Sequence, residues 1–281
     1  GEMNNTANKK VWLVTGTSTG IGLHLVQLLL HTGHKVIATS RRPEKVEEQF
    51  PGNASLLALK VDLTNDCDVK TSIEKAVKHF GKIDVVVNNA GYLLIGAIEE
   101  LTDKEFRDTL NVNLFGTVNV LRATLPHLRK QKRGSIINIA SNAGYVGMGN
   151  VGSYNAAKFA IIGISEALQK ETEPFGIKVT VVAPGQFRTN LWGSDAIKYP
   201  AEKIAEYNTD KFSEFFTNGN GKQPGDPDKL AQIIVNLTEM EKPPVHLLLG
   251  KDTYDMVIEH RNNEKKEFGD WETTTFSTDF S

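Results

Sequence analysis

The fold of this chain is decided by one stretch near its N-terminus, Val11-Trp12-Leu13-Val14-Thr15-Gly16-Thr17-Ser18-Thr19-Gly20-Ile21-Gly22. Its first five residues predict a buried strand, and its glycines then open a helix predicted over Gly20–His31. Glycine allows a sharp turn and lets a phosphate approach main-chain N–H groups, while the helix N-terminus adds partial positive charge. The spacing is G-x-x-x-G-x-G, so the general dinucleotide-binding fingerprint is met in mechanism only. Glycines can also serve merely to reverse the chain, but this position after the first strand favours a phosphate cradle.

Strand and helix patterns alternate along most of the chain beyond this stretch. The strands are nearly continuous in apolar residues, which is typical of a sheet covered by helices on both faces. The alternation predicts an α/β fold with a doubly wound parallel sheet of about seven strands in a single domain. The predicted strands are Val11–Thr15, Lys35–Ser40, Ser55–Val61, Ile83–Asn88, Ser135–Ser141, Lys178–Ala183 and His246–Leu249. The predicted helices include Gly20–His31, Asp66–Phe80, Thr102–Leu128, Tyr154–Pro174 and Pro227–Thr238.

The ends of the chain and one internal segment fall outside this alternation. Residues 1–10 are predicted to be a disordered start in which Gly1-Glu2 is a cloning remnant, and residues 11–250 form the domain. Residues 189–225, rich in Phe, Asn and Gly, predict an irregular flap over a substrate pocket. Residues 251–281 are a C-terminal extension, helix-like and then rich in Thr, Ser and Asp. We expect that tail either to be disordered or to pack its aromatic residues on the body or on a partner subunit.

Composition excludes several classes of protein. The chain is 40% hydrophobic and 23% charged with a net charge of −2, so it offers no overall electrostatic attraction to nucleic acid or to an anionic membrane. Cys67 is the only cysteine, which excludes an internal disulfide and a cysteine-rich zinc site, and no metal site is predicted. No apolar run approaches the roughly 18 residues of a membrane span, and no signal peptide precedes the first strand. We therefore predict a cytoplasmic protein.

Tyr154 and Lys158 form the most informative pair of polar residues. They stand four apart in a predicted helix, so both side chains leave the same face. An ammonium beside a phenol stabilises the phenolate and is expected to lower the phenol pKa. The pair could then donate a proton to a carbonyl or accept one from an alcohol. A Tyr and a Lys four apart also arise by chance on many helices, so the surrounding chain has to support this interpretation.

Arg41 and Arg42 follow the second predicted strand directly. A dinucleotide fold that binds NAD usually places an acidic residue there for the ribose 2′-hydroxyl, whereas a basic one suits the 2′-phosphate of NADP. Guanidinium groups match phosphate geometry, so NADP is favoured over NAD, with NAD as the alternative. The other interpretation is a solvated arginine pair in a surface loop.

Several further motifs occur in a fixed order. They are the glycine turn, Asp62-Leu63, Asn88-Asn89-Ala90-Gly91, Asn113, Ser141, Tyr154, Lys158 and Pro184-Gly185. Together they resemble the short-chain dehydrogenase/reductase family in its compact single-domain form, from about Val11 to Gly250. Within that family the chain looks similar to members related to hydroxysteroid and retinol dehydrogenases. The resemblance implies a Rossmann-type fold and an NAD(P)-dependent oxidoreductase acting on an alcohol or a carbonyl.

The resemblance also implies a role for each of four residues. Tyr154 would be the general acid/base, and Lys158 would lower its pKa and bind the nicotinamide ribose. Ser141 would polarise the substrate carbonyl, although an isolated serine is more often a turn or cap hydroxyl. Asn113 would hold a water that relays protons from Lys158, which would explain an asparagine in mid-helix, where its propensity is poor.

The residues that the resemblance assigns to the cofactor surround these four. The implied set is Gly16, Thr17, Ser18, Thr19, Gly20, Ile21, Gly22, Arg41, Arg42, Asp62, Leu63, Asn88, Ala90, Gly91, Tyr154, Lys158, Pro184, Gly185, Phe187 and Thr189. Thr19 departs from the family pattern, because NADP-preferring members often carry Arg or Lys there. The prediction of NADP therefore depends on Arg41 and Arg42.

The predicted substrate side is apolar. Leu93 and Trp192 are expected to face the substrate beside Ser141 and Tyr154. An apolar cleft with a few polar groups suits a lipophilic or aromatic ketone, although the same side chains could merely pack the flap onto the domain. Predicted helices apolar on more than one face indicate a homodimer or homotetramer. The alternative functions are a non-catalytic NADP(H) sensor or scaffold, and epimerisation or dehydration of a sugar nucleotide.

Overall fold

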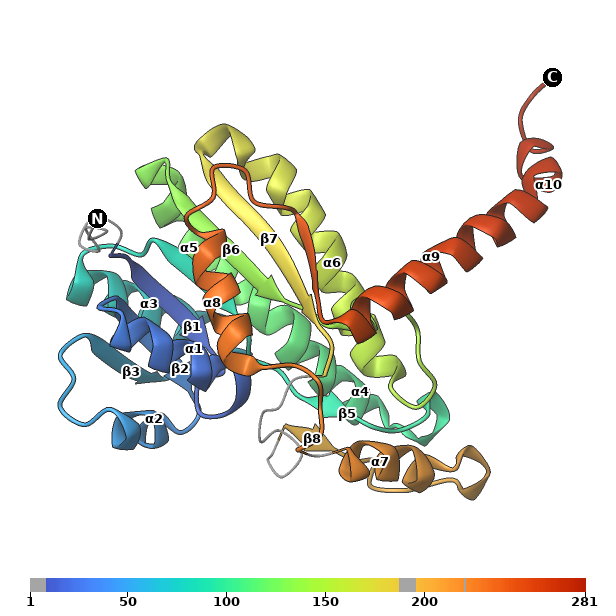
Figure 1. Cartoon of the computed structure of the whole chain (residues 1–281), viewed down its shortest axis with the longest axis horizontal. Helices are drawn as coiled ribbons and strands as arrows, with labels where there is room; N and C mark the ends of the chain where they lie inside the picture. The colour runs from blue at the N-terminus through green and yellow to red at the C-terminus, as the bar shows by residue number, and fades with distance from the viewer. Residues whose placement is uncertain (1–8, 187–195, 220) are drawn as a thin grey trace.

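The computed structural model describes residues 9–186, 196–219 and 221–281 and has one seven-stranded sheet at its centre (Figure 1). Every strand of the sheet is parallel to its neighbours, and the order across it is β3-β2-β1-β4-β6-β7-β9. The predicted doubly wound α/β fold in a single domain is thus confirmed. The strands are β1 (Val11–Thr15), β2 (Lys35–Ser40), β3 (Leu56–Lys60), β4 (Val85–Asn88), β6 (Gly134–Ile139), β7 (Ile177–Pro184) and β9 (His246–Leu249).

The chain reverses its direction across the sheet between β1 and β4. It first winds outwards from β1 through β2 to β3, and then returns to the other side of β1 with β4. Loops that leave neighbouring strands in opposite directions open a crevice at the carboxyl ends of those strands, where ligands of such sheets bind. The topology therefore places a site beside the glycine turn after β1 and the loop after β4.

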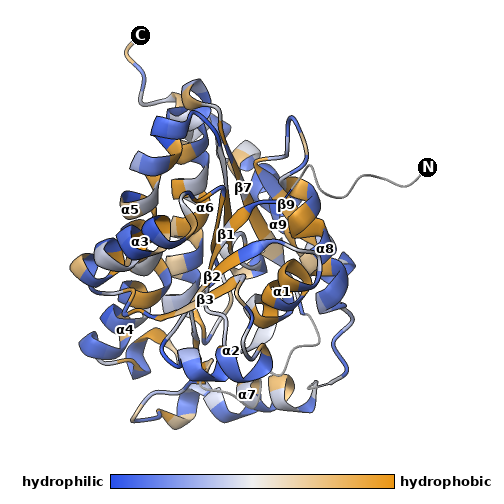
Figure 2. Ribbon diagram, turned by 90° about the vertical axis from the view of Figure 1, so that its left-hand side faces the viewer, coloured by the Kyte–Doolittle hydropathy of each residue, from blue (hydrophilic) through white to orange (hydrophobic). Residues whose placement is uncertain are grey.

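Helices cover both faces of the sheet (Figure 2). The strands alternate their side chains between these two faces. On one face Val14 and Val87 pack against α1 (Gly20–His31) and α8 (Pro227–Leu237). On the other face lie α3 (Asp66–Phe80), α5 (Gly116–Gln131) and α6 (Gly152–Thr172). Burial on both sides explains why the strand sequences are almost uniformly apolar.

The helix predicted over Thr102–Leu128 is interrupted, so that prediction was wrong in part. The structure has α4 (Asp103–Leu110), a π-helical turn over Asn111–Phe115 and then α5. Within the turn the Gly116 N–H donates to the Asn111 carbonyl, five residues earlier. Such π turns widen a helix and often mark functional sites. Here the turn contains Asn113.

The described part of the predicted flap, residues 196–219 and 221–225, is more ordered than its sequence indicated. Its strand β8 (Ile197–Lys198) pairs with β5 (Leu93–Leu94), which follows the loop after β4. The 3₁₀ turn η6 (Ala205–Tyr207) and helix α7 (Thr209–Asn218) come next. The short helix α2 (Pro43–Gln49) was also not among the predicted elements. Predicted site residues Phe187, Thr189 and Trp192 lie outside the described residues.

The C-terminal extension forms a long helix, α9 (Lys251–Asp270), followed by α10 (Glu272–Phe276), and projects away from the body (Figure 1). Only its first turns are packed, since Thr253 and Val257 are its buried residues. Farther along, Phe268, Trp271 and Phe276 are exposed, so these aromatics do not pack on the body as one prediction had it. Within the described part of the chain, no helix combines the length and apolar character needed to cross a membrane.

Candidate active site

The glycine turn between β1 and α1 brings two stretches of backbone very close together. Gly16 has a φ of +66°, and a Cβ atom added to it would lie 2.8 Å from the Cα of Ala90 in the loop after β4. A Cβ atom on Gly22 would lie 2.1 Å from the Gly16 carbonyl oxygen. Side chains therefore cannot occupy these positions without displacing the backbone. The Thr15 hydroxyl completes the junction by accepting hydrogen bonds from the Asn89 N–H at 2.9 Å and the Ala90 N–H at 3.0 Å.

The N-terminus of α1 fits an anionic group. Its cap residue Thr19 makes no side-chain capping bond, and its first turn carries no acidic residue. The first N–H groups of a helix have no partner within the helix, and the helix dipole adds partial positive charge there. Gly20, with a φ of +63°, starts the helix directly at the turn. These N–H groups suit an anionic group such as a pyrophosphate, which is the interpretation that the position of the turn after the first strand favoured.

An open depression at the ends of β2 and β3 is lined by basic and acidic residues. Arg41, Arg42, Lys60, Val61 and Asp62 form its wall. Hydrogen bonds from the Thr64 hydroxyl and N–H lower the pKa of the Asp62 carboxyl against the opposing effect of its burial, and Arg41 adds to the lowering. A sugar hydroxyl or a phosphate could bind here. Lys60 was not among the residues predicted from the sequence to line this site. The pairing of β3 with β2 places it opposite Ser40, next to Arg41 and Arg42.

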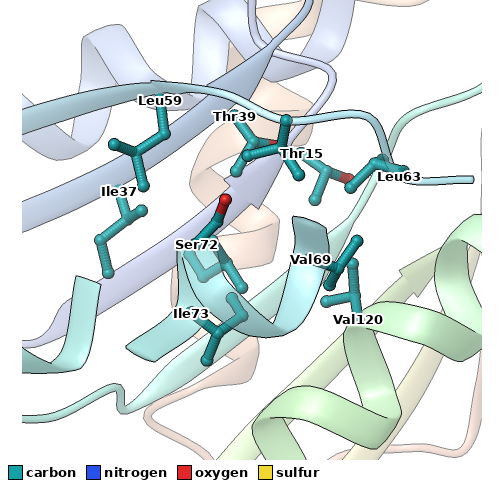
Figure 3. A pocket seen from close by; sticks show the side chains of 11 residues that line it. Thr15, Ile37, Thr39, Leu59, Leu63, Val69, Ser72, Ile73 and Val120 are labelled. Atoms are coloured by element: carbon teal, nitrogen blue, oxygen red, sulfur yellow. The ribbon is translucent and has the colours of Figure 1, made fainter. Parts of the chain in front are cut away.

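A cavity of about 10 Å³ lies below this edge, between the sheet and helices α3 and α5 (Figure 3). Its walls are mostly apolar, and Thr15, Thr39 and Ser72 contribute the hydroxyl groups. A cavity of this size is at the lower limit for holding a single water molecule. It is therefore a packing void beneath the cradle and not a substrate site.

Tyr154 and Lys158 both lie on α6, one turn apart as predicted. Lys158 is only 5% exposed, and its Nζ lies 5.5 Å from the centre of the Tyr154 ring. The same ammonium donates a hydrogen bond to the Ile139 carbonyl at the end of β6, at 3.1 Å. This bond fixes the lysine between the helix and the sheet.

Burial shifts the pKa values of both residues. It raises the pKa of the Tyr154 phenol, with the Ser141 hydroxyl acting in the opposite direction through a hydrogen bond. It lowers the pKa of Lys158 to about 8. The prediction that Lys158 lowers the phenol pKa differs from this direction, because the loss of water around the phenol raises the pKa and Lys158 is not among the groups that oppose it.

Ser141 follows β6 and combines two functions. Its hydroxyl accepts a hydrogen bond from the Ala143 N–H at 3.1 Å and donates to Asn142 Oδ1 at 3.0 Å, so it caps the short 3₁₀ turn η3 (Asn142–Gly144). It also reaches the Tyr154 phenol. The hydroxyl that caps η3 is therefore the same group that lies beside the phenol, and the cap fixes its position.

Asn113 in the π turn is held by the main chain of Tyr92. Its Oδ1 accepts from the Tyr92 N–H at 2.8 Å, and its Nδ2 donates to the Tyr92 carbonyl at 2.7 Å. A Cβ atom on Gly91 would lie 2.5 Å from Asn113 Oδ1 and 4.0 Å from Lys158 Nζ. Asn113 therefore adjoins Lys158 at Gly91, although its side chain is engaged in anchoring the loop after β4.

Other predicted residues have structural partners that the sequence did not reveal. Asn88 Nδ2 donates to Asn138 Oδ1 at 2.9 Å, while Asn88 Oδ1 is buried without a hydrogen-bond partner in the described structure. Gly185, after Pro184 at the end of β7, packs against α9, since a Cβ atom there would lie 2.3 Å from Thr253 Oγ1. Leu63 packs against the α3 and α5 side of the core. Leu93 lies in β5 beside β8.

A model of the short-chain dehydrogenase family matches residues 10–199. An oxidoreductase of Botryotinia fuckeliana is 34% identical over 88% of this chain and 90% of its own length. A 3-ketodihydrosphingosine reductase of Bacteroides thetaiotaomicron is 37% identical over 86% of this chain and 88% of its own. The chain belongs to the short-chain dehydrogenase/reductase family, whose members are NAD(P)-dependent oxidoreductases.

Solved structures show the same architecture. A short-chain dehydrogenase from Streptomyces avermitilis is 36% identical with a TM-score of 0.89, and the match covers 97% of this chain and 100% of that one. Fewer than about ten residues of this chain are therefore unmatched, so most of the C-terminal extension has a counterpart there. A protein named ElxO, solved with NADP bound, is 29% identical with a TM-score of 0.72 over 86% of this chain and 96% of its own.

Substitution of Gly22 by alanine tests the glycine cradle. The new Cβ would meet the Gly16 carbonyl at 2.1 Å, so the turn must shift, and overpacking of this kind costs about 1–3 kcal/mol. We expect Gly22→Ala to weaken NADPH binding, measured by fluorescence titration, at least about tenfold. Gly269→Ala is the matched control, because nothing lies within 4 Å of its added Cβ. Equal NADPH affinity in the two variants would show that the close approach at Gly22 is not needed for cofactor binding.

The buried ammonium of Lys158 predicts a specific pH dependence of stability. Its pKa is about 8 in the folded chain against an ordinary 10.5, so between these values the unfolded chain binds a proton that the folded chain does not. This group therefore makes the free energy of unfolding rise with pH across that window, by on the order of 3 kcal/mol. In Lys158→Met this contribution is absent. The free energy of unfolding, measured by chemical denaturation, should therefore rise less between pH 7 and pH 10.5 than in the wild type. The exposed Lys75→Met serves as control, and a rise retained in Lys158→Met would contradict the assignment.

Proposed function

We propose that this protein is an NADPH-dependent reductase that transfers hydride to a lipophilic ketone. One observation carries the proposal: Tyr154, Lys158, Ser141 and Asn113 converge beside the loop after β4, next to the glycine cradle. When bound, the nicotinamide supplies the hydride. The chain's own residues bind and orient the reactants and move the proton.

Tyr154 is the proton donor in this proposal. Its phenol, whose pKa is raised by burial, is protonated at neutral pH and can donate to a carbonyl oxygen. Ser141 lies beside the same phenol. Its single hydroxyl proton, which is donated to Asn142 Oδ1 in the structure, turns to the carbonyl oxygen when a substrate binds. The position of Ser141 is held by the cap of η3. Two donors converging on one oxygen stabilise the negative charge that develops there during hydride transfer.

Lys158 and Asn113 hold the surroundings of Tyr154 and Ser141 in place. Lys158 holds its charge near the phenol ring and binds the nicotinamide ribose, and its bond to the Ile139 carbonyl fixes it in place. Asn113 holds the loop after β4 against Lys158 through the main chain of Tyr92. Because both polar atoms of its side chain have these partners, Asn113 serves the proton relay by shaping the place where a water binds.

NADP is the preferred nicotinamide cofactor in this proposal. Arg41 and Arg42 line the depression at the end of β2, and Lys60 adds a third cation there. Such a group of cations matches the 2′-phosphate that distinguishes NADP from NAD. The structure of ElxO with NADP bound supports this choice by family likeness. A cytoplasmic location and assembly into a homodimer or homotetramer stay predictions, the latter supported by exposed Phe115 and Phe159.

Two observations support a lipophilic substrate. The loop after β4 leads into β5, Leu93–Leu94, and the described flap opposite it carries exposed aromatic residues such as Phe215. The Bacteroides relative is named for a ketone on a long-chain lipid base. A non-catalytic sensor is disfavoured, because such a protein can dispense with proton transfer while this chain has all four residues in place. A panel of ketones with NADPH and NADH, followed at the nicotinamide absorbance, tests the proposal.

Tyr154→Phe removes the proton donor and leaves the ring. General acid catalysis contributes about 100-fold to 10,000-fold, so we expect kcat to fall at least about 100-fold. The dissociation constant of NADPH should stay within about twofold, because the phenol oxygen contributes little to cofactor binding. Steady-state kinetics and fluorescence titration measure the two quantities. Retained turnover would show that another group donates the proton.

Arg41→Asp tests the choice of cofactor. A charge-assisted hydrogen bond contributes about 1.5–3 kcal/mol, so the ratio of kcat/KM for NADPH to that for NADH should fall about 10-fold to 100-fold. Arg129→Asp makes the same charge change on α5, away from the depression, and should leave the ratio unaltered. If Arg41→Asp behaves like this control, Arg41 does not read the phosphate.

A further inference from the structure

Glu100 is a carboxylate in an unusual place. It is the last residue of the 3₁₀ turn η1 (Ile98–Glu100) and is only 5% exposed. In all three of its side-chain hydrogen bonds described here, the carboxylate is the acceptor. One donor is the Ala97 N–H of its own turn, at 2.8 Å. The other two are the Ile204 N–H, at 2.9 Å, and the Thr209 hydroxyl. Charged side chains are rarely buried to this extent unless they are paired, so these contacts need a reason.

Both distant donors belong to the flap. Ile204 immediately precedes η6, and Thr209 is the first residue of α7 and only 3% exposed. The Glu100 carboxylate therefore holds the two ends of one turn of the flap about 100 residues away in the sequence. Burial raises the pKa of this carboxyl, but the bonds from Thr209, Ile204 and Ala97 and the charge of Lys203 outweigh it, and the pKa is lowered. Glu100 is thus charged at neutral pH.

Two neighbouring carboxylates make further bonds to the same part of the flap. Glu105 Oε2 accepts from the Ala201 N–H at 2.9 Å, and Glu99 accepts from the Tyr207 hydroxyl. The four flap residues Ala201, Ile204, Tyr207 and Thr209 are thus attached through acceptors on residues 99–105. We call residues 196–209 the anchored segment. Of these attachments, only that of Glu100 is buried and made by one carboxylate to two flap residues.

The body side of this attachment leads to the catalytic helix. A Cβ atom on Gly152 would lie 2.9 Å from Ile98, so η1 rests on the start of α6, two residues before Tyr154. The anchored segment also begins with β8, which pairs with β5 after the loop at Tyr92. It is therefore fastened at one end beside the loop held by Asn113 and at the other by Glu100.

We propose that Glu100 is a positioning residue for the substrate, because it fixes the anchored segment against the substrate side of the site. The inference rests on the proposed reductase function and extends it to a residue that touches neither cofactor nor substrate. It predicts that loss of this attachment weakens substrate binding without affecting the cradle for NADPH. Loss of the Glu100 carboxylate should then change KM for the ketone, and should leave kcat and the affinity for the cofactor nearly unchanged.

The chemistry of the contacts requires a carboxylate and not an amide. Every partner of Glu100 is a donor, whereas the amide of a glutamine would direct its own N–H groups at one of them. Loss of a hydrogen bond to a charged group costs about 1.5–3 kcal/mol, equivalent to about a 10-fold to 100-fold change in an equilibrium constant. Glu100→Gln should raise the open population of the anchored segment by this factor.

Limited proteolysis with trypsin measures the opening directly. Lys198 and Lys203 lie in the anchored segment, and proteolysis tracks the population of the open form when closing is fast. We expect Glu100→Gln to be cleaved there at least about tenfold faster than wild type. The KM for the ketone should rise by a similar factor while kcat changes less than about threefold. The NADPH dissociation constant and the thermal midpoint of the body should equal those of Glu74→Gln, an exposed carboxylate on α3 that serves as control.

The partner residue supplies an independent variant. Thr209→Val removes the hydroxyl that donates to Glu100 with little change of shape, and should reproduce the faster cleavage and the raised KM. Thr209→Ser keeps the hydroxyl and should show the cleavage rate and the KM of the wild type. Cleavage of Glu100→Gln at the rate of Glu74→Gln would overturn the proposal, and so would equal loss of NADPH binding and of thermal stability. Because cleavage needs no substrate, it judges the attachment even if no ketone is reduced, in which case only the proposed reductase function fails.

Discussion

The parallel pairing of β1 with β4 is the contact on which the rest of the site depends. At this pair the chain changes its direction across the sheet, so the loops that follow the two strands diverge and leave room between them. The Thr15 hydroxyl then joins the loops by accepting from the N–H groups of Asn89 and Ala90, and Asn89 Nδ2 donates back to the Gly16 carbonyl at 3.0 Å. Because main chain meets main chain here, the cradle tolerates no side chain at Gly16. The end of the site at the glycine turn is thus built from backbone and from the sheet itself.

The end of the site that contains Tyr154 and Lys158 is instead built from polar side chains that the core has to accommodate. Asn88 bonds Asn138, whose Nδ2 donates to Ser165 Oγ on α6 at 3.0 Å, and Lys158 bonds the Ile139 carbonyl from the same helix. These bonds tie β4, β6 and α6 together. Burying the ammonium is unfavourable, as its lowered pKa shows, and the large apolar interface of α6 with the sheet compensates for it. The site is therefore less stable than an apolar equivalent, which is expected where function sets the residue.

The sequence was sufficient to predict the sheet because strands buried on both faces are apolar almost throughout, as in β4 and β6. It also placed Tyr154 and Lys158 on one face of a helix from their spacing, as α6 has them, whereas their roles were inferred only from the motifs around them. It was insufficient where the cause lies far away in the chain. The π turn at Asn113 is stabilised by the main chain of Tyr92, 21 residues earlier, and Gly185 admits the first turn of α9. The direction of the phenol pKa shift was predicted wrongly, since spacing shows the nearby charge but not the loss of water.

The two halves of the site differ in how they are held, and the difference matters for specificity. The cradle is shared structure, since the family model matches residues 10–199 and so ends within the flap. The flap residues that bond the carboxylates lie just beyond that match and are Ala201, Ile204, Tyr207 and Thr209. A few side-chain hydrogen bonds, each contributing about 1–3 kcal/mol, are easier to alter than the pairing of seven strands. A fold of this kind can therefore change the residues of this segment while the glycine turn, β1 and β4 stay the same.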